Sequence, residues 1–426
     1  RLYLSRHSKL RKARRRKANE YHLEIGSSDP SKVFEEDEQV GCGVKENSMK
    51  LIHLSDLHLG KRVNEYSMLE DQEYILKKII NVIDDEKPNG VIIAGDVYDK
   101  SIPSAEAVQL FDDFLVQLAK RSLKVFVISG NHDSPERIAF GSRIMDASGI
   151  HMSPVYSGDI APIPLEDEFG TVNIYMLPFI KPAHVRRYAE NEITTYTEAV
   201  EYVISKLNID PANRNVLVTH QFVTGALRSE SEEISVGGSD NVDTYVFEPF
   251  DYVALGHIHS PQTCGSDNIR YCGTPLKYSF SEAHDKKSVT VVELREKGNV
   301  SYKTVELVPQ HDLVELKGTY EELTLKSFYE NTTWQEDYTH ITLTDEEDIP
   351  DVIGKLRTVY HRLMKLDYDN KRTRSNMEIS GASDVESKSP LELFSDFYEL
   401  QNNQPMSQEQ LEFMREMIEK TWEDEQ

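Results

Sequence analysis

The sequence has few cysteines and lacks a long apolar run. Its three cysteines, Cys42, Cys264 and Cys272, stand at irregular spacing among 426 residues. This odd count argues against a disulfide framework and predicts reduced thiols in a cytoplasmic protein. No apolar run approaches the roughly 18 residues that a membrane-spanning helix needs, so we expect no membrane span.

Positive charge is also scarce, since the formal net charge is -25. This acidic balance argues against a surface that wraps nucleic acid over the whole molecule. It does not exclude a local site that cuts nucleic acid, because bound divalent metal ions can supply positive charge inside a site. It does predict weak binding of duplex DNA by this chain alone, because such binding depends on phosphate neutralisation by Lys and Arg.

The first 48 residues differ in composition from the rest. Residues 1–17 carry nine Lys or Arg without a periodic apolar face, and residues 35–38 are all acidic. The basic segment could be an arm that binds nucleic acid. We favour a disordered leader, or translated sequence upstream of a natural start at Met49, because a globular pattern begins abruptly there. The segment has no apolar core typical of a signal peptide.

From Met49 onward, short apolar strands alternate with amphipathic helices, which indicates an α/β domain over residues 49–285. We expect strands at 51–54, 91–94, 125–128, 172–177, 216–219 and 252–255, and helices at 66–86, 105–120, 137–148 and 197–207.

The pattern changes after residue 285. A hairpin at 288–307 and mixed strand and helix up to 366 predict a second, smaller α/β domain over residues 286–366. Residues 367–389 are polar and read as a linker. Two amphipathic helices are expected in the tail, residues 390–426, at 390–398 and 407–425.

Polar side chains follow five of the predicted strands of the first domain. In an open α/β sheet the ligand crevice lies beyond the carboxyl ends of the strands, so these side chains should meet. Extended backbone would also point residues i and i+2 the same way. The five polar groups are Asp56 and His58, Asp96, Asn131 and His132, His220, and His257 and His259.

This set of side chains predicts a metal centre. Imidazole with carboxylate suits manganese, iron or zinc, and a mixed oxygen and nitrogen set favours none of them uniquely. One ion needs only three or four protein ligands, so seven imply two ions that share a carboxylate. Taken alone, each group is ordinary: a polar turn after a strand, or a structural histidine. Their repetition at five strand ends is what indicates a site.

The same residues resemble the calcineurin-like metallophosphoesterases, whose pattern is D-x-H, G-D-x-x-D, G-N-H-[DE], H and G-H-x-H. The matching blocks, all in order, are Asp56–His58, Gly95–Asp99, Gly130–Asp133, His220 and Gly256–His259. Within that superfamily, residues 131–137 and 273–282 are similar to the bacterial SbcD family of Mre11-like nucleases. The resemblance covers residues 49 to about 366 well and the tail more loosely.

The resemblance implies a fold and a ligand set. The fold would be a four-layer α/β/β/α metallophosphoesterase core with a smaller α/β capping domain and a C-terminal helical tail. Two divalent ions, usually Mn2+, would bind. Carried over by position, Asp56, His58, Asp96 and His259 would hold one ion, and Asp96, Asn131, His220 and His257 the other, so that Asp96 bridges.

The resemblance also implies catalytic roles. His132 would not ligate but would protonate the leaving group as general acid, and Asp133 could orient it. Archaeal nucleases of the Mre11 type carry a histidine where Asp99 stands, so the role of Asp99 stays open.

The implied function is that of the nuclease subunit of an SbcCD complex in DNA repair, recombination and replication. It would act on double-stranded DNA as a 3′–5′ exonuclease, as an endonuclease and in hairpin opening. The partners would be a second copy in a homodimer and an SbcC/Rad50-type coiled-coil ATPase, bound by the C-terminal helices. Those helices could instead fold back on their own domain.

Two other interpretations share the metal blocks. A protein phosphatase or a cyclic-nucleotide phosphodiesterase would carry the same ligands, but would not need the second domain and the helical tail. A scaffold protein with an inactive site is the other alternative, and the complete set of ligands argues against it.

Overall fold

The computed structural model describes residues 48–229, 240–371, 373, 390–402 and 405–423. The expected leader therefore lies outside the described residues, apart from Ser48. Within the described part of the chain, no helix combines the length and the apolar character needed to cross a membrane.

The first of two six-stranded sheets contains the strand at Met49. Four of its strands run parallel and reach one edge of the sheet, and the two strands at the other side pair antiparallel. In spatial order the strands are β16 (Val300–Glu306), β15 (Ser288–Leu294), β1 (Met49–Leu54), β4 (Gly90–Ala94), β5 (Lys124–Ile128) and β6 (Ile150–Met152).

The second six-stranded sheet has four parallel strands in its middle and an antiparallel strand at each edge. In spatial order the strands are β13 (Gln262–Cys264), β14 (Ser266–Tyr271), β12 (Tyr252–Gly256), β9 (Arg214–His220), β8 (Gly170–Leu177) and β7 (Ile163–Asp167). The short strands β10 (Phe222–Val223) and β11 (Asn241–Val242) pair separately, as do β2 (Arg62–Val63) and β3 (Tyr66–Ser67).

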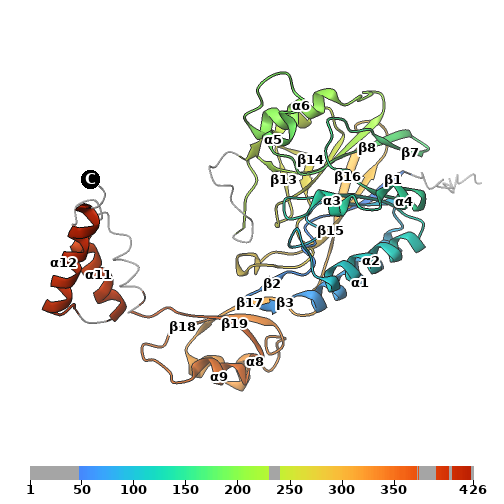
Figure 1. The fold of residues 1–426 in the computed structure, drawn as a ribbon. Helices are drawn as coiled ribbons and strands as arrows, with labels where there is room; N and C mark the ends of the chain where they lie inside the picture. The colour runs from blue at the N-terminus through green and yellow to red at the C-terminus, as the bar shows by residue number, and fades with distance from the viewer. Residues whose placement is uncertain (1–47, 230–239, 372, 374–389, 403–404, 424–426) are drawn as a thin grey trace, which may run out of the picture. The chain divides into compact units, whose positions relative to one another are not determined.

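Alternation of side chains along the strands builds four layers. Leu51 of β1 packs in a core shared by the two sheets, whereas its neighbour Ile52 packs against helices on the outer face. Helices α1 (Leu69–Glu86) and α2 (Ala105–Lys120) cover the first sheet, and α6 (Tyr196–Lys206) covers the second (Figure 1). The expected α/β/β/α order is confirmed.

Local sequence explains where these helices begin. Ser104 precedes α2 and its hydroxyl accepts a hydrogen bond from Ala107 N. Thr195 and Glu198 form a capping box at the start of α6. In α1, buried apolar residues recur at helical spacing and face the sheet. They are Ile75, Leu76, Ile79, Ile80 and Ile83.

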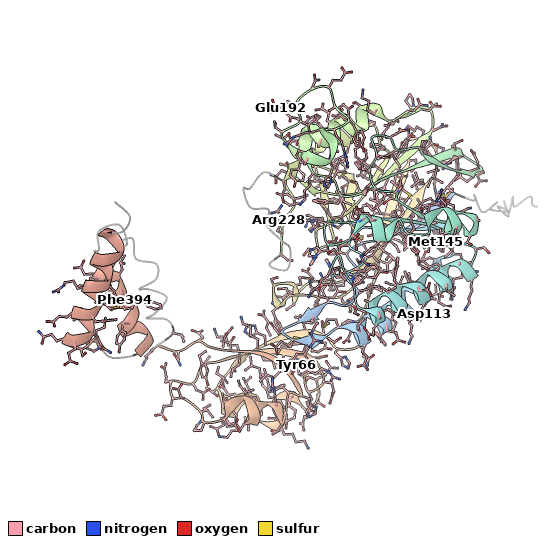
Figure 2. All side chains as sticks on the ribbon, in the orientation of Figure 1. Tyr66, Asp113, Met145, Glu192, Arg228 and Phe394 are labelled. Carbon is pink, nitrogen blue, oxygen red and sulfur yellow. The ribbon has the colours of Figure 1, made fainter. Side chains whose placement is uncertain are left out.

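The helix expected over residues 137–148 is wrong. The segment forms three short pieces, α3 (Pro135–Ile138), α4 (Ser142–Met145) and the 3-10 turn η1 (Asp146–Ser148). Gly141, at φ 76°, separates α3 from α4 in a left-handed conformation that no α-helix contains. Met145 of α4 still packs on the core under α1 and α2, and Figure 2 draws it in the same helical layer as Asp113 of α2.

The predicted domain boundary at residue 285 is also misplaced. The hairpin β15–β16 belongs to the first sheet, because β15 pairs with β1 along Met49–His53. The apolar pattern of the hairpin indicated two strands but could not show which strand they would pair with. The smaller α/β unit begins after this hairpin.

That smaller unit is a three-stranded parallel sheet with helices of its own. It contains its own apolar cluster, which includes Leu316, Ile341 and Leu363. The elements are β17 (Leu313–Gly318), α7 (Tyr320–Thr324), α8 (Lys326–Tyr329), β18 (Tyr338–Leu343), α9 (Val352–Arg357) and β19 (Arg362–Tyr368). The two tail helices are present as α11 (Pro390–Asn402) and α12 (Gln408–Glu423).

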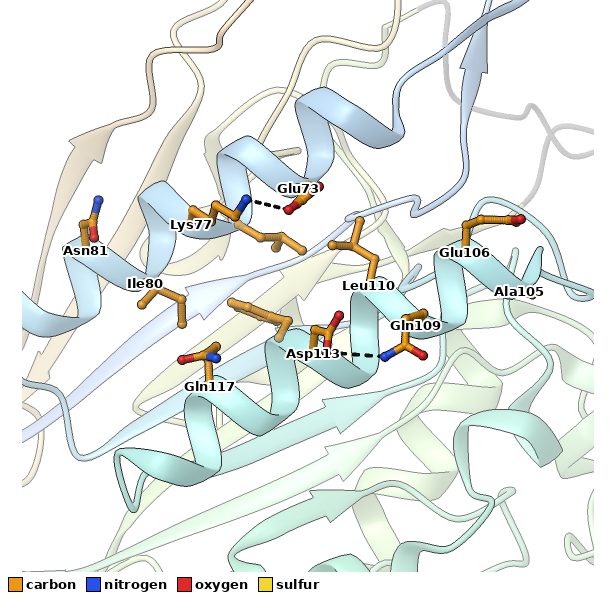
Figure 3. Close-up of a pocket in the computed structure, with 12 residues that line it drawn as sticks. Glu73, Lys77, Ile80, Asn81, Ala105, Glu106, Gln109, Leu110, Asp113 and Gln117 are labelled. Atoms are coloured by element: carbon orange, nitrogen blue, oxygen red, sulfur yellow. Dashed lines mark hydrogen bonds and ion pairs between the residues drawn. The ribbon is translucent and has the colours of Figure 1, made fainter. Parts of the chain in front are cut away.

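A groove of about 870 Å³ runs between α1 and α2. Ile80 of α1 and Leu110 of α2 line it, and the ion pair between Lys77 and Glu73 lies along its α1 side (Figure 3). None of the predicted metal ligands lines this groove. Cavity size therefore does not locate the site that the sequence predicts.

Candidate metal centre

The structure brings all seven predicted ligands together at the carboxyl ends of five strands. Asp56 and His58 follow β1, Asp96 follows β4 and Asn131 follows β5, while His220 ends β9. His257 and His259 follow β12. Three overlapping groups of these side chains, one of which includes His132, have ligand atoms within 4.8 Å of one another.

One half of the centre contains Asp56, His58 and His259, whose ligand atoms form one of those groups. The Nε2 atoms of His58 and His259 lie 3.2 Å apart. His58 Nε2 also lies 3.7 Å from Asp96 Oδ2. All four side chains are buried. Two imidazoles and two carboxylates pointed at one another in this way form the nitrogen and oxygen donor set of a transition-metal site.

The other half gathers around Asn131. Its Oδ1 lies 2.9 Å from His257 Nδ1 and 3.0 Å from His220 Nε2. His220 Nε2 is 3.2 Å from Asp96 Oδ2. Asp96 thus belongs to both halves, which is the position that the bridging prediction requires.

Four of the seven predicted ligands take backbone conformations that side-chain-bearing residues rarely adopt. The φ angles are 52° at Asp56, 44° at His58, 48° at Asp96 and 103° at His257. The prediction of extended backbone at Asp56 and His58 is therefore wrong, although both side chains do reach the same group of ligand atoms. Strain of this kind costs about 1–3 kcal/mol per residue and is concentrated at functional sites.

Two glycines allow the strand ends to approach closely enough. A Cβ on Gly130 would lie 2.1 Å from Asp96 Oδ1. A Cβ on Gly256 would lie 2.0 Å from the backbone oxygen of Ala94 and 2.6 Å from His220 Nδ1. Any side chain at either position would push the ligands apart.

The centre carries two buried carboxylates and little compensating charge from side chains. Burial raises the pKa of the Asp56 carboxyl, an effect that His220 opposes and Asp96 reinforces. Burial alone would lower the pKa of His220, but the charge and hydrogen bond of Asp96 raise it to about 9. A metal ion held by His220 would take the place of that proton and would supply positive charge to the two carboxylates.

Hydrogen bonds outside the ligand set fix two of the imidazoles. His220 Nδ1 lies 2.8 Å from the backbone oxygen of Ala94, to which it donates when Nε2 is the ligand. His259 Nδ1 lies 3.3 Å from Glu282 Oε1. A partner of this kind selects the tautomer in which the other nitrogen is free to bind metal. The donor set, the close packing of ligand atoms and the glycine contacts fit two divalent cations.

His132 lies beside the ligands without belonging to the core of either half. Its backbone N–H donates to Asp96 Oδ1 at 2.9 Å, and its Nδ1 lies 3.1 Å from the backbone oxygen of Asp99. Its Nε2 lies 4.0 Å from Asp96 Oδ2. Its side chain is 18% exposed, whereas six of the seven predicted ligands are buried and Asn131 is half-buried. These contacts turn Nε2 toward the centre, where a general acid would have to stand.

Asp133 does not contact His132 directly in the described structure. Its carboxylate accepts hydrogen bonds from the backbone N–H groups of Val97, Tyr98 and Gly130. Burial, followed by the nearby Asp96, raises the pKa of Asp133 to about 7. The contacts therefore favour a role for Asp133 in joining two strand-end loops, and leave the orientation of His132 to the backbone of Asp99.

Asp99 has a second role through its side chain. Its Oδ1 pairs with Lys61 Nζ at 2.9 Å and lies 3.9 Å from His58 Nδ1. Sequence reasoning missed Lys61, as well as Glu282, Tyr278 and Gln72, which contact the histidines or their backbone. The resemblance of residues 273–282 was a signal for Tyr278 and Glu282 but carried no residue roles, and nothing pointed to Lys61 or Gln72.

Comparisons with known proteins match the first domain and the C-terminal part of the chain separately. The family model described as calcineurin-like phosphoesterase matches residues 49–261. The chain is 30% identical to the SbcD subunit of the SbcCD nuclease of Staphylococcus epidermidis, over 87% of this chain and 98% of that protein. The chain belongs to the SbcD family of calcineurin-like phosphoesterases.

This SbcD family member has further matches among relatives, family models and solved structures. The protein of the same name from Staphylococcus saprophyticus is 32% identical over 79% of this chain and 90% of that protein. A second family model, described as type 5 capsule protein repressor C-terminal domain, matches residues 309–402. Among solved structures, a dimetal phosphatase from Danio rerio aligns with a TM-score of 0.38 at 13% identity, over 61% of this chain and 99% of that one.

Proposed function

We propose that this chain is the nuclease subunit of an SbcCD-type complex and hydrolyses DNA phosphodiesters at a centre of two divalent metal ions. The observation that carries the proposal is the cluster of seven buried or half-buried ligands. It lies in a chain that matches a nuclease subunit over 98% of that protein's length. We propose Mn2+ as the ion and the cytoplasm as the compartment.

The mechanism divides between the ions and the protein. Bound ions would lower the pKa of a water molecule and stabilise negative charge on the phosphate in an in-line displacement. Asp56, His58, Asp96 and His259 would hold one ion. Asp96, Asn131, His220 and His257 would hold the other. The strained backbone and the buried hydrogen bonds keep these side chains in place.

His132 supplies the proton in this proposal. With Nδ1–H donated to the carbonyl of Asp99, a proton on Nε2 points toward the centre. Transfer of that proton to the departing nucleotide oxygen makes a poor leaving group a better one.

Three specific activities on DNA belong to this proposal: 3′–5′ exonuclease action on double-stranded DNA, endonuclease action and hairpin opening. The test is cleavage of end-labelled linear duplex and hairpin DNA with Mn2+, compared with p-nitrophenyl phosphate and cyclic nucleotides. We expect rapid cleavage of DNA and slow turnover of the small esters. Preference for a cyclic nucleotide, or for a phosphomonoester, would replace this proposal with another metallophosphoesterase activity.

The tail is proposed to bind a coiled-coil ATPase of the SbcC/Rad50 type. Its helices leave large apolar side chains exposed, including Phe397 at 56% and Phe413 at 62%. A groove of about 320 Å³ is lined by α11 and α12 residues that include Phe394, Tyr398 and Met414. Aromatic and methionine side chains presented in this way typically anchor a partner helix.

A chain that ends at Ser387 tests this docking site. It should keep Mn2+-dependent nuclease activity, because every proposed ligand precedes residue 260. It should lose co-purification with the ATPase and any stimulation by ATP. The matched control is the full chain with Leu325→Asp, an exposed apolar residue outside the tail. Full-strength binding by the truncated chain would rule the tail out as the docking element.

A homodimer is proposed through the helical layer over the first sheet. Phe140 and Ile144 are each 81% exposed, and Ile102 and Val108 are 73% and 44% exposed. All four belong to segments that connect β4 to β5 or β5 to β6, so they lie in neighbouring parts of one layer. Exposed apolar patches of this kind mark protein interfaces.

Ile144→Asp tests the dimer by sedimentation or light scattering. We expect the variant to be monomeric at concentrations at which the unaltered chain is a dimer. Val308→Asp, a change at an apolar residue that is 65% exposed elsewhere, is the control and should leave the dimer intact. An Ile144→Asp protein that remains a dimer would place the interface on another surface.

A further inference from the structure

His259 is held on both its ring and its backbone by one later segment. Thr274 N–H donates to the backbone oxygen of His259 at 3.0 Å, and Lys287 Nζ donates to the same oxygen at 3.0 Å. Glu282 Oε1 lies 3.3 Å from His259 Nδ1. We call residues 273–287 the clasp, because its two ends meet at His259.

Glu282 is the centre of the clasp. Its side chain is fully buried, and its second oxygen accepts a hydrogen bond from Lys287 Nζ at 2.6 Å. The same oxygen lies 3.4 Å from Tyr278 N and 3.4 Å from Thr274 Oγ1. One carboxylate therefore joins the two ends of the clasp to the histidine ring.

The buried ion pair between Lys287 and Glu282 is not explained by its contribution to stability. Lys287 and Glu282 have side-chain exposures of 3% and 0%. Taking two charges out of water costs several kcal/mol each, and apolar replacement of such pairs is often neutral or stabilising. A role at the metal centre would explain the burial, because the carboxylate of Glu282 is aimed at the ring of His259, a proposed metal ligand.

The clasp also supports His58, the neighbouring ligand. The ring of Tyr278 lies edge-on to the rings of His58 and His259, with centroids 5.8 and 6.4 Å away. Its hydroxyl donates to the backbone oxygen of Leu57 at 2.6 Å. Gln72 Nε2 lies within hydrogen-bond distance of Tyr278 Oη and of the backbone oxygen of His58.

We propose that Glu282 is the positioning residue for the ion held by Asp56, His58, Asp96 and His259, an inference that rests on the proposed two-metal centre. Glu282 accepts the proton of His259 Nδ1 and so leaves Nε2 unprotonated and turned toward the ion. Lys287 balances the charge of Glu282 and holds the backbone of the same histidine. The ion held by Asn131, His220 and His257 does not depend on the clasp, because the backbone oxygen of Ala94 orients His220.

The test is Mn2+ binding to the full-length protein by isothermal titration calorimetry, with electron paramagnetic resonance to count bound ions. Glu282→Gln should weaken one of two sites by about 10–100-fold, the usual effect of losing such a partner, and leave the other unchanged. Cleavage of duplex DNA should then need a correspondingly higher Mn2+ concentration, while the rate at saturating Mn2+ recovers in large part.

Two further variants distinguish a positioning role of Glu282 from a contribution of its ion pair to the stability of the fold. Glu282→Gln with Lys287→Met removes both buried charges and leaves neither unpaired; Asp285, the other partner of Lys287 at 3.2 Å, is 26% exposed and stays solvated. This double variant should show the same one-site loss. Asp167→Asn breaks a comparably buried pair with Arg214, in which the side-chain exposures are 3% for Asp167 and 2% for Arg214. It should lower thermal stability without weakening either Mn2+ site.

The outcomes are distinct. Unchanged binding at both sites in the double variant, or an equal loss at both, would overturn the positioning role. Failure of the unaltered protein to bind two Mn2+ ions would instead overturn the proposed two-metal centre.

Discussion

His220 is oriented by the backbone of Ala94, and Gly256 lets the two strand ends approach. His259 is oriented by the carboxylate of Glu282, and the ring of Tyr278 packs beside it. One half of the centre thus depends on strand geometry and glycines, while the other depends on side chains from a segment outside the strands.

The two kinds of support lie in different parts of the chain. The family model of calcineurin-like phosphoesterases ends at residue 261, and the second family model begins at residue 309. The clasp, residues 273–287, falls between them. The predicted ligands and Ala94 therefore lie in the segment that the phosphoesterase model matches, whereas the proposed support of His259 comes from a segment that neither model includes.

The change with the largest expected effect removes the residue that both halves share. In Asp96→Asn, an amide replaces the carboxylate that would bridge the two ions, so both Mn2+ affinities should fall by at least about 100-fold, more than loss of an outer partner costs. Ion counting on the purified variant measures this. If only one ion is lost, Asp96 is not the bridge, and the two halves are more independent than we propose.

A second change should slow the cleavage of DNA without removing an ion from either half of the metal centre. His132→Ala removes the proposed general acid and no ligand, so cleavage of duplex DNA should slow by about 10²–10⁴-fold while two ions remain bound. Metal counting beside a single-turnover assay decides the matter. Loss of an ion from this variant would make His132 a ligand.

The smallest expected effect concerns chiefly one half. Gly256→Ala places a methyl group against Ala94 O and the ring of His220, and 3.0 Å from Ser55 Cβ, so the ion held by His220, Asn131 and His257 should lose the most affinity, by about 10–100-fold. Gly318→Ala is the control, because Gly318 has no positive φ and its added Cβ comes no closer than 3.2 Å to a neighbour, the end of the Glu322 side chain. Compared with Glu282→Gln, this variant should weaken the opposite site, and a loss at both sites would show that the two supports are mechanically linked.

Much of the site could be predicted because its signals are local. Each strand is a short apolar run, and each ligand group follows its strand within a few residues, as Asp96 follows Ala94. Parallel strands present their carboxyl ends at one edge of a sheet, and here three such ends of the first sheet meet two of the second. The chemical types of the ligands, and their number, follow directly from those positions.

Other features could not be read in this way. The left-handed backbone at Asp56 and His58 is not written in their residue types, and only surrounding hydrogen bonds hold it, such as Asp56 N to Gly95 O. The break at Gly141 ended a helix that apolar periodicity alone would continue. The apolar pattern of the hairpin β15–β16 predicted the start of a new domain, because its pairing with β1 joins residues that lie far apart in the chain.

The alternation of strands and helices and the seven candidate ligands can be read from the amino-acid sequence, because both depend on neighbouring residues. The contacts that support those ligands follow from the packing of the folded chain. Tyr278 bonds to Leu57 across 221 residues and His220 to Ala94 across 126. Contacts between residues so far apart leave no periodic pattern in the chain, since their geometry is set by how the two sheets pack and not by local spacing.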